Sequence, residues 1–472
     1  MSIKGLLLPI FSLPSKYGIG DFGKEAFSFI KILKKNGFNT WQILPLNPIG
    51  FANSPYQSYS SFAFEDLYIS LDDLFSNGLI TKPISFNENK EHIDYIKVRS
   101  IKEIYYQEAF TNYSKINGFG ELDKFALANK EISQYAFYMS EKRMNFIASW
   151  NKWTIYQDER FNKLYHYHLF KQMILLNEWK KLKKFANDNG IQIMGDLPFY
   201  VSYDSSDVYF NRQYFELDQN FNPTLVAGVP PDYFSSTGQR WGNPIYNFKA
   251  LSEKNYDFLI HRIIYSSSLY DILRLDHFRA FDTYYVIPSY CVDAKIGEWR
   301  FAPGYEIFDM IFKEKESIHL VAEDLGLLRE EVYTLRDHYH LPGMNILQFN
   351  IFDIMKRKSL NLEDFDNVIT YIGTHDNDTL KGFIKSLKKS QKLQLMNYFM
   401  KLDLKLSSLE EMFIEYSFKY FNDVIISFTD LMLLGSSYRI NKPSTVNNLN
   451  WSVKLVDFTL LNKALKKGLH HV

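Results

Sequence analysis

Short apolar runs alternate with segments of helical periodicity along most of the chain. The segments Glu25–Lys35 and Leu169–Phe185 carry apolar residues at helical spacing, and each is followed by an Asn-Gly pair, which ends helices. Eight apolar runs are predicted as strands: Leu6–Ile10, Thr40–Leu44, Ile191–Asp196, Asp271–Asp276, His319–Glu323, Asn345–Phe349, Val368–Ile372 and Val424–Phe428. Strand and helix in alternation indicate a parallel sheet, and eight such strands favour an α/β fold of the (β/α)8 TIM barrel class.

The spacing between the runs predicts one barrel with large insertions. We expect residues 1–472 to form a single catalytic barrel. Residues 45–190 are predicted as a helix-rich insertion after the second strand, and residues 197–270 as a loop-rich insertion after the third. Too little follows Phe428 for a separate C-terminal domain. Both insertions would wall a substrate groove at the catalytic face.

The charge and cysteine content exclude several classes of partner. Lys and Arg number 54 and Asp and Glu number 54, which argues against a nucleic-acid surface or polybasic membrane binding and suits a neutral substrate. The single Cys291 forms no internal disulfide, and no apolar run approaches the length that spans a bilayer. The apolar N-terminal stretch is broken too early by Pro9 for a signal peptide. We therefore expect a cytoplasmic protein.

Three carboxylates follow predicted strands. Asp276 and Glu323 close their runs, and Asp376 lies just past another. In a parallel barrel the side chains at the C-terminal ends of the strands converge on one face, where such barrels carry out catalysis. Two or three acids directed at one point are typical of enzymes that break or rebuild glycosidic bonds.

Each acid also has a structural interpretation. Arg274 and Asp276 lie two residues apart on one strand, so their side chains point the same way. The guanidinium could keep Asp276 ionised as a nucleophile, or the two residues could form only a structural ion pair. Glu323 is a candidate proton donor, because strand alternation sends it and Asp324 to opposite faces; alternatively, both acids cap the next helix.

The segment Thr374–Thr379 packs polar residues directly after an apolar run. A turn would use Asn and Asp in this way, but His375 and Asp376 together are more than a turn needs. We expect these two side chains to bind sugar hydroxyls.

Two further patterns are predicted to be structural. Gly18–Gly23 matches the dinucleotide-binding glycine pattern, but it does not follow the first strand directly, and the second strand lacks the required acid. The pairs His166/His168 and His338/His340 lack the other ligands of a metal site and are predicted to be solvated helix residues.

Six motifs in order resemble the amylomaltases, the 4-α-glucanotransferases of glycoside hydrolase family 77. The resemblance extends from Gly5–Pro9 to Arg439–Pro443. The motifs are Ser54–Gln57, Gly195–Pro198, Gly238–Pro244, Arg274–Arg279, Ala322–Gly326 and Gly373–Thr379.

The resemblance implies an α-amylase-type barrel with a retaining mechanism and no cofactor or obligatory metal. Asp276 matches the family nucleophile, Glu323 the general acid/base, and Asp376 the third acid that binds hydroxyls beside the scissile bond. The other expected substrate-binding residues are Arg274, His375, Asp196, Tyr56, Ser54, Gln239, Trp241, Tyr233, Phe234 and Asn377.

The implied reaction transfers α-1,4-glucan segments from a maltooligosaccharide or glucan donor to glucose or a glucan acceptor. The aromatic segment Asp232–Tyr246 would bind the acceptor. A hydrolase on the same scaffold is the alternative enzyme, and a non-catalytic glucan-binding protein is the alternative outside enzymes. A monomer and a homodimer both remain open.

Overall fold

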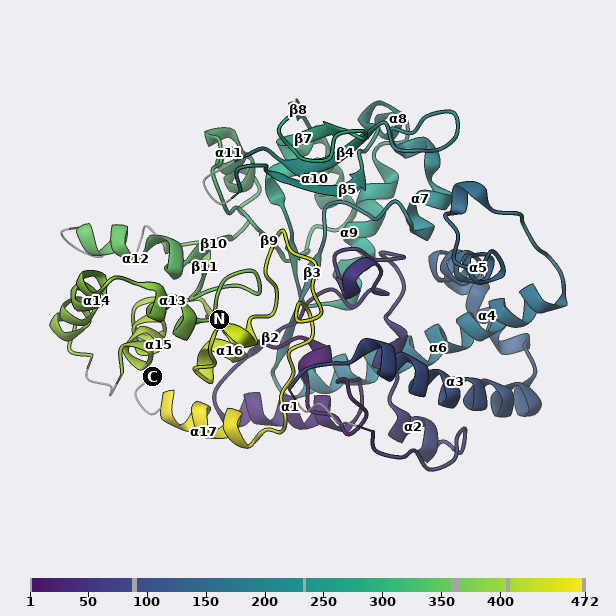
Figure 1. Cartoon of the computed structure of the whole chain (residues 1–472), viewed down its shortest axis with the longest axis horizontal. Helices are drawn as coiled ribbons and strands as arrows, with labels where there is room; N and C mark the ends of the chain where they lie inside the picture. Colours follow the sequence, from purple (N-terminus) through teal and green to yellow (C-terminus); the bar gives the residue numbers. More distant parts are fainter. Residues whose placement is uncertain (1, 87–90, 232–234, 358–364, 405–407, 469–472) are drawn as a thin grey trace.

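Eight parallel strands form the centre of the molecule (Figure 1). The computed structural model describes residues 2–86, 91–231, 235–357, 365–404 and 408–468. The barrel strands are β1 (Lys4–Leu7), β2 (Thr40–Gln42), β3 (Gln192–Leu197), β6 (Ile272–Leu275), β9 (Leu320–Ala322), β10 (Gly343–Ile346), β11 (Val368–Tyr371) and β12 (Val424–Ser427). They pair in the order β10-β11-β12-β1-β2-β3-β6-β9, and the amide of Ala322 donates to the carbonyl of Pro342 at 2.8 Å to join the two ends. The predicted (β/α)8 fold is confirmed.

Helices connect these strands and cover the barrel. They are α1 (Lys24–Lys35), α2 (Leu71–Ser76), α3 (Tyr95–Asn117), α4 (Gly120–Ala128), α5 (Lys130–Met144), α6 (Glu159–Asp188), α7 (Ser206–Phe210), α8 (Phe248–Ser252), α9 (Asp257–Leu269), α10 (Gly304–Glu314), α11 (Glu330–His338), α12 (Leu347–Lys356), α13 (Leu380–Ser386), α14 (Lys389–Lys401), α15 (Leu409–Tyr420), α16 (Phe428–Leu431) and α17 (Thr459–Gly468). Helices α2–α6 lie on one side of the barrel and α12–α15 on the other (Figure 1).

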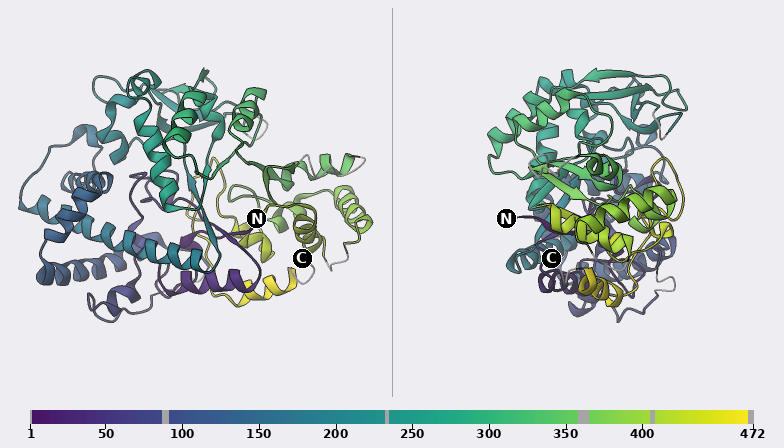
Figure 2. Two further views of the ribbon diagram at one scale, coloured as in Figure 1. Left: turned by 180° about the vertical axis from the view of Figure 1, so that it is seen from behind. Right: turned by 90° about the vertical axis from the view of Figure 1, so that its left-hand side faces the viewer.

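The two helices predicted from periodicity, α1 and α6, form where local sequence signals favour a helix. Helix α1 carries an acid in its first turn and lysines in its last, which suits the helix dipole, and it buries one apolar face. Its chain leaves through Gly37 at φ +76°, a conformation that glycine adopts without strain. Helix α6 runs beside α1, with the rings of Phe27 and Phe185 5.0 Å apart (Figure 2). The two helices therefore cover the barrel surface around β2 and β3.

A second sheet lies beside the barrel and was not anticipated from the sequence. It consists of β4 (Leu225–Val229), β5 (Gln239–Pro244), β7 (Thr283–Pro288) and β8 (Glu298–Phe301), paired antiparallel in the order β5-β4-β7-β8. Two strands come from the long segment after β3 and two from the segment after β6. Because every strand is short, and β4 and β7, which join the two halves, are distant in sequence, no local periodicity marks this sheet.

Two predicted strands end three residues earlier than expected. β1 stops at Leu7, and residues 347–349 of the sixth predicted strand instead begin α12. An apolar run alone does not distinguish a buried strand from a buried helix, since both place apolar side chains in the core. Here Leu347 and Ile351 are buried one helical turn apart.

The prediction of solvated histidines is wrong for one pair. His166 and His168 lie on α6 and are only 5% exposed each, because α4 and α5 pack over that face. His166 stacks on Phe119 at 4.2 Å and contacts Asp123 at 2.9 Å. His338 and His340 are exposed as expected.

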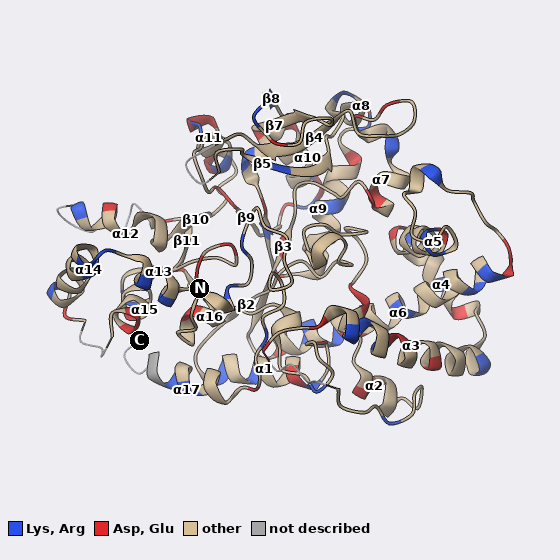
Figure 3. Ribbon diagram, in the orientation of Figure 1, with Lys and Arg blue, Asp and Glu red and all other residues tan. Residues whose placement is uncertain are grey.

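The glycine-rich segment before α1 has a packing role. A Cβ on Gly20 would lie 2.0 Å from the carbonyl oxygen of Ile10, so only glycine allows this backbone approach. Acidic and basic residues are interspersed over the outer helices (Figure 3), as the balanced composition leads one to expect. Within the described ranges, none of the helices has the length and apolar character needed to cross a membrane.

Candidate active site

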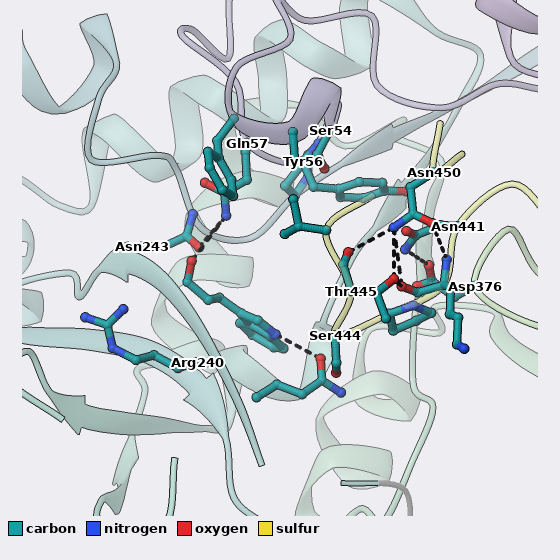
Figure 4. Close-up of a pocket in the computed structure, with 18 of the residues that line it drawn as sticks. Ser54, Tyr56, Gln57, Arg240, Asn243, Asp376, Asn441, Ser444, Thr445 and Asn450 are labelled. Atoms are coloured by element: carbon teal, nitrogen blue, oxygen red, sulfur yellow. Dashed lines mark hydrogen bonds between the residues drawn. The ribbon is translucent and has the colours of Figure 1, made fainter. Parts of the chain in front are cut away.

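A cavity of about 560 Å³ opens at the C-terminal ends of the barrel strands (Figure 4). Its walls come from the segments that follow β2, β3, β6, β7 and β11, from the segment that carries β5, and from residues 441–451 after β12. The expected site residues that line it are Ser54, Tyr56, Gln239, Trp241, Asp276, His375 and Asp376.

Arg274 joins two carboxylates at the base of this cavity. Its Nη1 donates to both oxygens of Asp196 at 2.8 Å, and its Nη2 lies 3.0 Å from Oδ1 of Asp276. Arg274 and Asp196 come from neighbouring strands in register, and both are almost fully buried. The Asp276 side chain keeps 27% of its surface exposed, so the ion pair leaves this carboxylate open to the cavity.

Tyr56 links Asp196 to an aromatic wall. Its hydroxyl donates to Oδ2 of Asp196 at 2.5 Å, and its ring stacks on His375 with centroids 5.3 Å apart. Trp451 packs against both rings, at 5.5 Å and 5.8 Å. Burial, followed by the Asp196 charge, raises the pKa of Tyr56 well above its usual value, so this hydroxyl stays a donor.

Glu323 and Asp324 point to different parts of the molecule. Oε2 of Glu323 accepts from the amide of His277 at 2.8 Å, next to Asp276 in sequence. Asp324 instead accepts from the amide of Met344 at 2.8 Å and pairs with Arg336. Neither acid caps α11, whose N-cap is Arg329. Glu323 is not among the residues that line the open cavity but lies directly behind the turn that carries Asp276.

The environment raises the pKa of both acids. Burial raises the pKa of Asp276 to about 7, with Arg274 opposing the rise and Asp196 and Asp376 adding to it. Burial raises the pKa of Glu323 well above its usual range, against Arg274 and with help from Asp276. An acid that ionises beside one that keeps its proton can divide the roles of nucleophile and proton donor.

Asp376 lies in a turn built by its neighbours. Its Oδ1 accepts from Nδ2 of Asn441 at 2.6 Å, and Nε2 of His375 lies 3.5 Å from the same oxygen. Burial lowers the pKa of His375, so the ring is neutral near pH 7. The expected binding residue Asn377 also holds the turn: its Oδ1 accepts from the amide and hydroxyl of Thr374 at 2.8 and 2.9 Å.

The opposite wall carries the expected residues of β5. Oε1 of Gln239 accepts from the indole nitrogen of Trp241 at 3.2 Å, which orients the indole along the cavity. The Trp241 ring meets the ring of His277 edge-on at 4.9 Å. Tyr233 and Phe234 lie outside the described residues. No group of three or more His, Cys, Asp or Glu side chains arranged to hold a metal ion occurs in the part of the chain that the structure describes.

Several cavity residues were missed from the sequence. His277 adopts a left-handed backbone conformation at φ +54°, which turns its amide toward Glu323, and no local pattern announces this. Asn441, Asn450 and Trp451 come from the far C-terminal side of the barrel. The motif Arg439–Pro443 was the only available signal for this segment.

The comparisons with known proteins agree with this geometry. The profile of the glycoside hydrolase family 77 4-alpha-glucanotransferases matches residues 8–459. The 4-alpha-glucanotransferase of Streptococcus pneumoniae is 34% identical and covers 98% of this chain and 95% of its own length. That of Thermus thermophilus is 35% identical, covering 96% and 94%.

A solved structure is also similar to this chain over its whole length. The amylomaltase from Streptococcus agalactiae, in complex with acarbose, superposes with a TM-score of 0.93 at 32% identity, covering 99% of this chain and 98% of that one. The chain therefore belongs to the 4-alpha-glucanotransferases of glycoside hydrolase family 77, glycosyltransferases that act on α-1,4-glucans.

Proposed function

We propose that this protein transfers α-1,4-glucan segments from maltooligosaccharides to other maltooligosaccharides or to glucose by a retaining double displacement. The observation that carries the proposal is the arrangement around Arg274. Asp276 faces the cavity on one side of this guanidinium, and Glu323, whose pKa is raised, accepts a hydrogen bond from the amide of the next residue, His277. A retaining mechanism uses two such carboxyl groups close together, one as the nucleophile and one as the proton donor.

In the first step the Asp276 carboxylate attacks the anomeric carbon of the donor. The bond from this carbon to the glycosidic oxygen breaks, and Glu323 gives its proton to the departing oxygen. Arg274 beside Asp276 favours the ionised nucleophile. The products are a covalent glycosyl-enzyme and the released reducing-end fragment.

In the second step Glu323, now a carboxylate, takes the proton from the hydroxyl of an acceptor sugar. The acceptor oxygen attacks the anomeric carbon, and the bond to Asp276 breaks. Two inversions give overall retention of configuration. Glu323 ends with its proton and Asp276 with its charge, so the enzyme is regenerated.

The sugar beside the scissile bond is held by the opposite wall. Asp376 is the third acid, and the neutral His375 and the ring of Tyr56 form one continuous surface with it. We infer that Asp376 and His375 bind ring hydroxyls and that Arg274 and Asp196 fix the nucleophile. These contacts would hold the ring in the distorted shape that the transition state needs.

Transfer rather than hydrolysis requires a sugar acceptor to compete with water. The indole of Trp241, oriented by Gln239, offers a flat apolar surface on the Asp276 side of the cavity. Stacking on such a ring contributes about 1 kcal/mol beyond area burial if it behaves like other aromatic pairs. We place the acceptor sugar there.

Incubation with maltotriose tests the reaction type. We expect a ladder of shorter and longer maltooligosaccharides with almost no gain in reducing ends, since each transfer makes one new bond for each bond broken. Chromatography of the products and a reducing-sugar assay measure this. A steady rise in reducing ends without longer chains would instead establish a hydrolase, and tight glucan binding with neither change would establish a binding protein.

The pH dependence of kcat/KM should be bell-shaped. Asp276 must be ionised to attack, so activity falls as the pH drops through its pKa of about 7. Glu323 must be protonated to assist departure, so activity falls as the pH rises through its raised pKa. Initial rates with maltotriose from about pH 5 to 10 give the profile. A profile that is flat below neutral pH would contradict the assignment of Asp276.

A further inference from the structure

The segment Arg439–Trp451, here called the C-terminal strap, forms one wall of the cavity. It follows α16 and crosses the mouth of the barrel, where Asn441, Ser444, Thr445 and Asn450 line the space opposite Arg240 and Asn243 (Figure 4). The strap lies far from the three acids in sequence, yet it contacts one of them directly.

The contact is made by Asn441. Its side-chain amide donates to Oδ1 of Asp376 at 2.6 Å (Figure 4). The carboxylate of Asp376 is 46% exposed, so this bond occupies one oxygen and leaves the other accessible to a ligand. A carboxylate on a turn can rotate about its side-chain torsions, and a short bond to a charged group is among the stronger hydrogen bonds.

The strap does not depend on this side chain for its own fold. The amide of Asn441 donates to the carbonyl of His375 at 3.0 Å, and the amide of Trp451 donates to the carbonyl of Ile440 at 2.7 Å. Nδ2 of Asn450 donates to the carbonyl of Thr445 at 2.9 Å. These bonds survive a change in the Asn441 side chain, which leaves it free for another role.

The other groups around Asp376 do not replace this bond. Nε2 of His375 lies 3.5 Å away, and Arg439 reaches only the backbone carbonyl of Asp376. Asp276 faces the same cavity with a like charge, and Lys442 lines it from the strap. A neutral amide holds a carboxylate in place while leaving its full negative charge for sugar hydroxyls, which a salt bridge would not do.

We propose that Asn441 is a positioning residue of the active site, whose side-chain amide holds the Asp376 carboxylate in the orientation that binds the donor sugar. The inference rests on the role proposed above for Asp376. It makes the strap part of the catalytic machinery and not merely a cover over the barrel.

Two substitutions at Asn441 separate positioning from folding. Asn441→Ala removes the donor and should lower kcat/KM about 10- to 100-fold, as expected for a lost hydrogen bond to a charged group. Asn441→Asp should be most damaging at high pH, where the new carboxylate repels Asp376. At lower pH the new carboxyl group keeps a proton and can donate to Asp376, so activity relative to the unsubstituted protein at the same pH recovers. The alkaline limb of the pH profile should therefore move down by on the order of one pH unit.

Asn448→Asp is the matched control. Asn448 is an exposed residue of the same strap and is not part of the cavity lining. The control therefore adds the same charge to the same segment away from Asp376. Its kcat/KM and pH profile should match those of the unsubstituted protein.

Rates are measured as total maltotriose consumption, which counts both transfer and hydrolysis, together with the melting temperature of each variant. The proposal is overturned if Asn441→Ala retains full activity, or if Asn441→Asp loses activity equally at every pH. If the unsubstituted protein only hydrolyses maltotriose, the proposed transfer is overturned, but the variants at Asn441 still test the positioning role. If the unsubstituted protein consumes no maltotriose, both the proposed transfer and the positioning role are overturned.

Discussion

Asp276→Asn should abolish glucan transfer, lowering kcat by on the order of 10⁴-fold or more, while the fold is retained. The amide is nearly the same size as the carboxylate but cannot attack the anomeric carbon. The side chain is 27% exposed at the cavity surface, so no core packing is lost. Arg274 keeps its two contacts with Asp196, which holds the guanidinium in place.

The control for this variant is Asp353→Asn on α12. Asp353 is 72% exposed and pairs with the exposed Lys356, so the same chemical change there should leave the rate unchanged. Maltotriose turnover and circular dichroism are measured for both proteins. Normal turnover by Asp276→Asn would remove Asp276 from the role of nucleophile, whereas an unfolded variant would call for Asp276→Ser as a second test.

Glu323→Gln should separate the two half-reactions. With maltotriose, loss of the proton donor should lower kcat by about 10²- to 10⁴-fold. With α-maltotriosyl fluoride, fluoride leaves without a proton, so Asp276 should still be glycosylated. The second step then stalls, because no carboxylate takes the proton from the acceptor. The glycosyl-enzyme should accumulate and be visible by mass spectrometry of the intact protein.

Peptide mapping of the trapped protein locates the covalent bond. We expect the added maltotriosyl mass on the peptide that contains Asp276, and no trapped species in Glu306→Gln, an exposed position on α10. Sugar attached to another residue would refute the assigned nucleophile. If the reaction of Glu323→Gln with the fluoride substrate is slowed as much as its reaction with maltotriose, Glu323 has a role other than proton transfer.

The barrel itself could be predicted because its signals are local. Strand–helix alternation placed all eight parallel strands in order, and α1 and α6 ended where their Asn-Gly pairs indicated. The strand positions in turn brought Asp276, Glu323 and Asp376 to one end of the barrel, since the C-terminal ends of parallel strands share a face.

The misses share a different cause. The antiparallel sheet pairs strands from two separate insertions, and the buried pair His166 and His168 depends on helices that pack over α6. In each case the outcome was set by a partner that local sequence does not reveal.

The sequence by itself determined the barrel, the family and the three acids, because periodicity and motifs are properties of short segments. Only the tertiary structure decided how those acids are held. Arg274 sits between Asp196 and Asp276, the amide of His277 holds Glu323, and Asn441 reaches Asp376 from the C-terminal strap. Burial and neighbouring charge set the pKa of a carboxyl group, and both come from residues that meet only when the chain is folded.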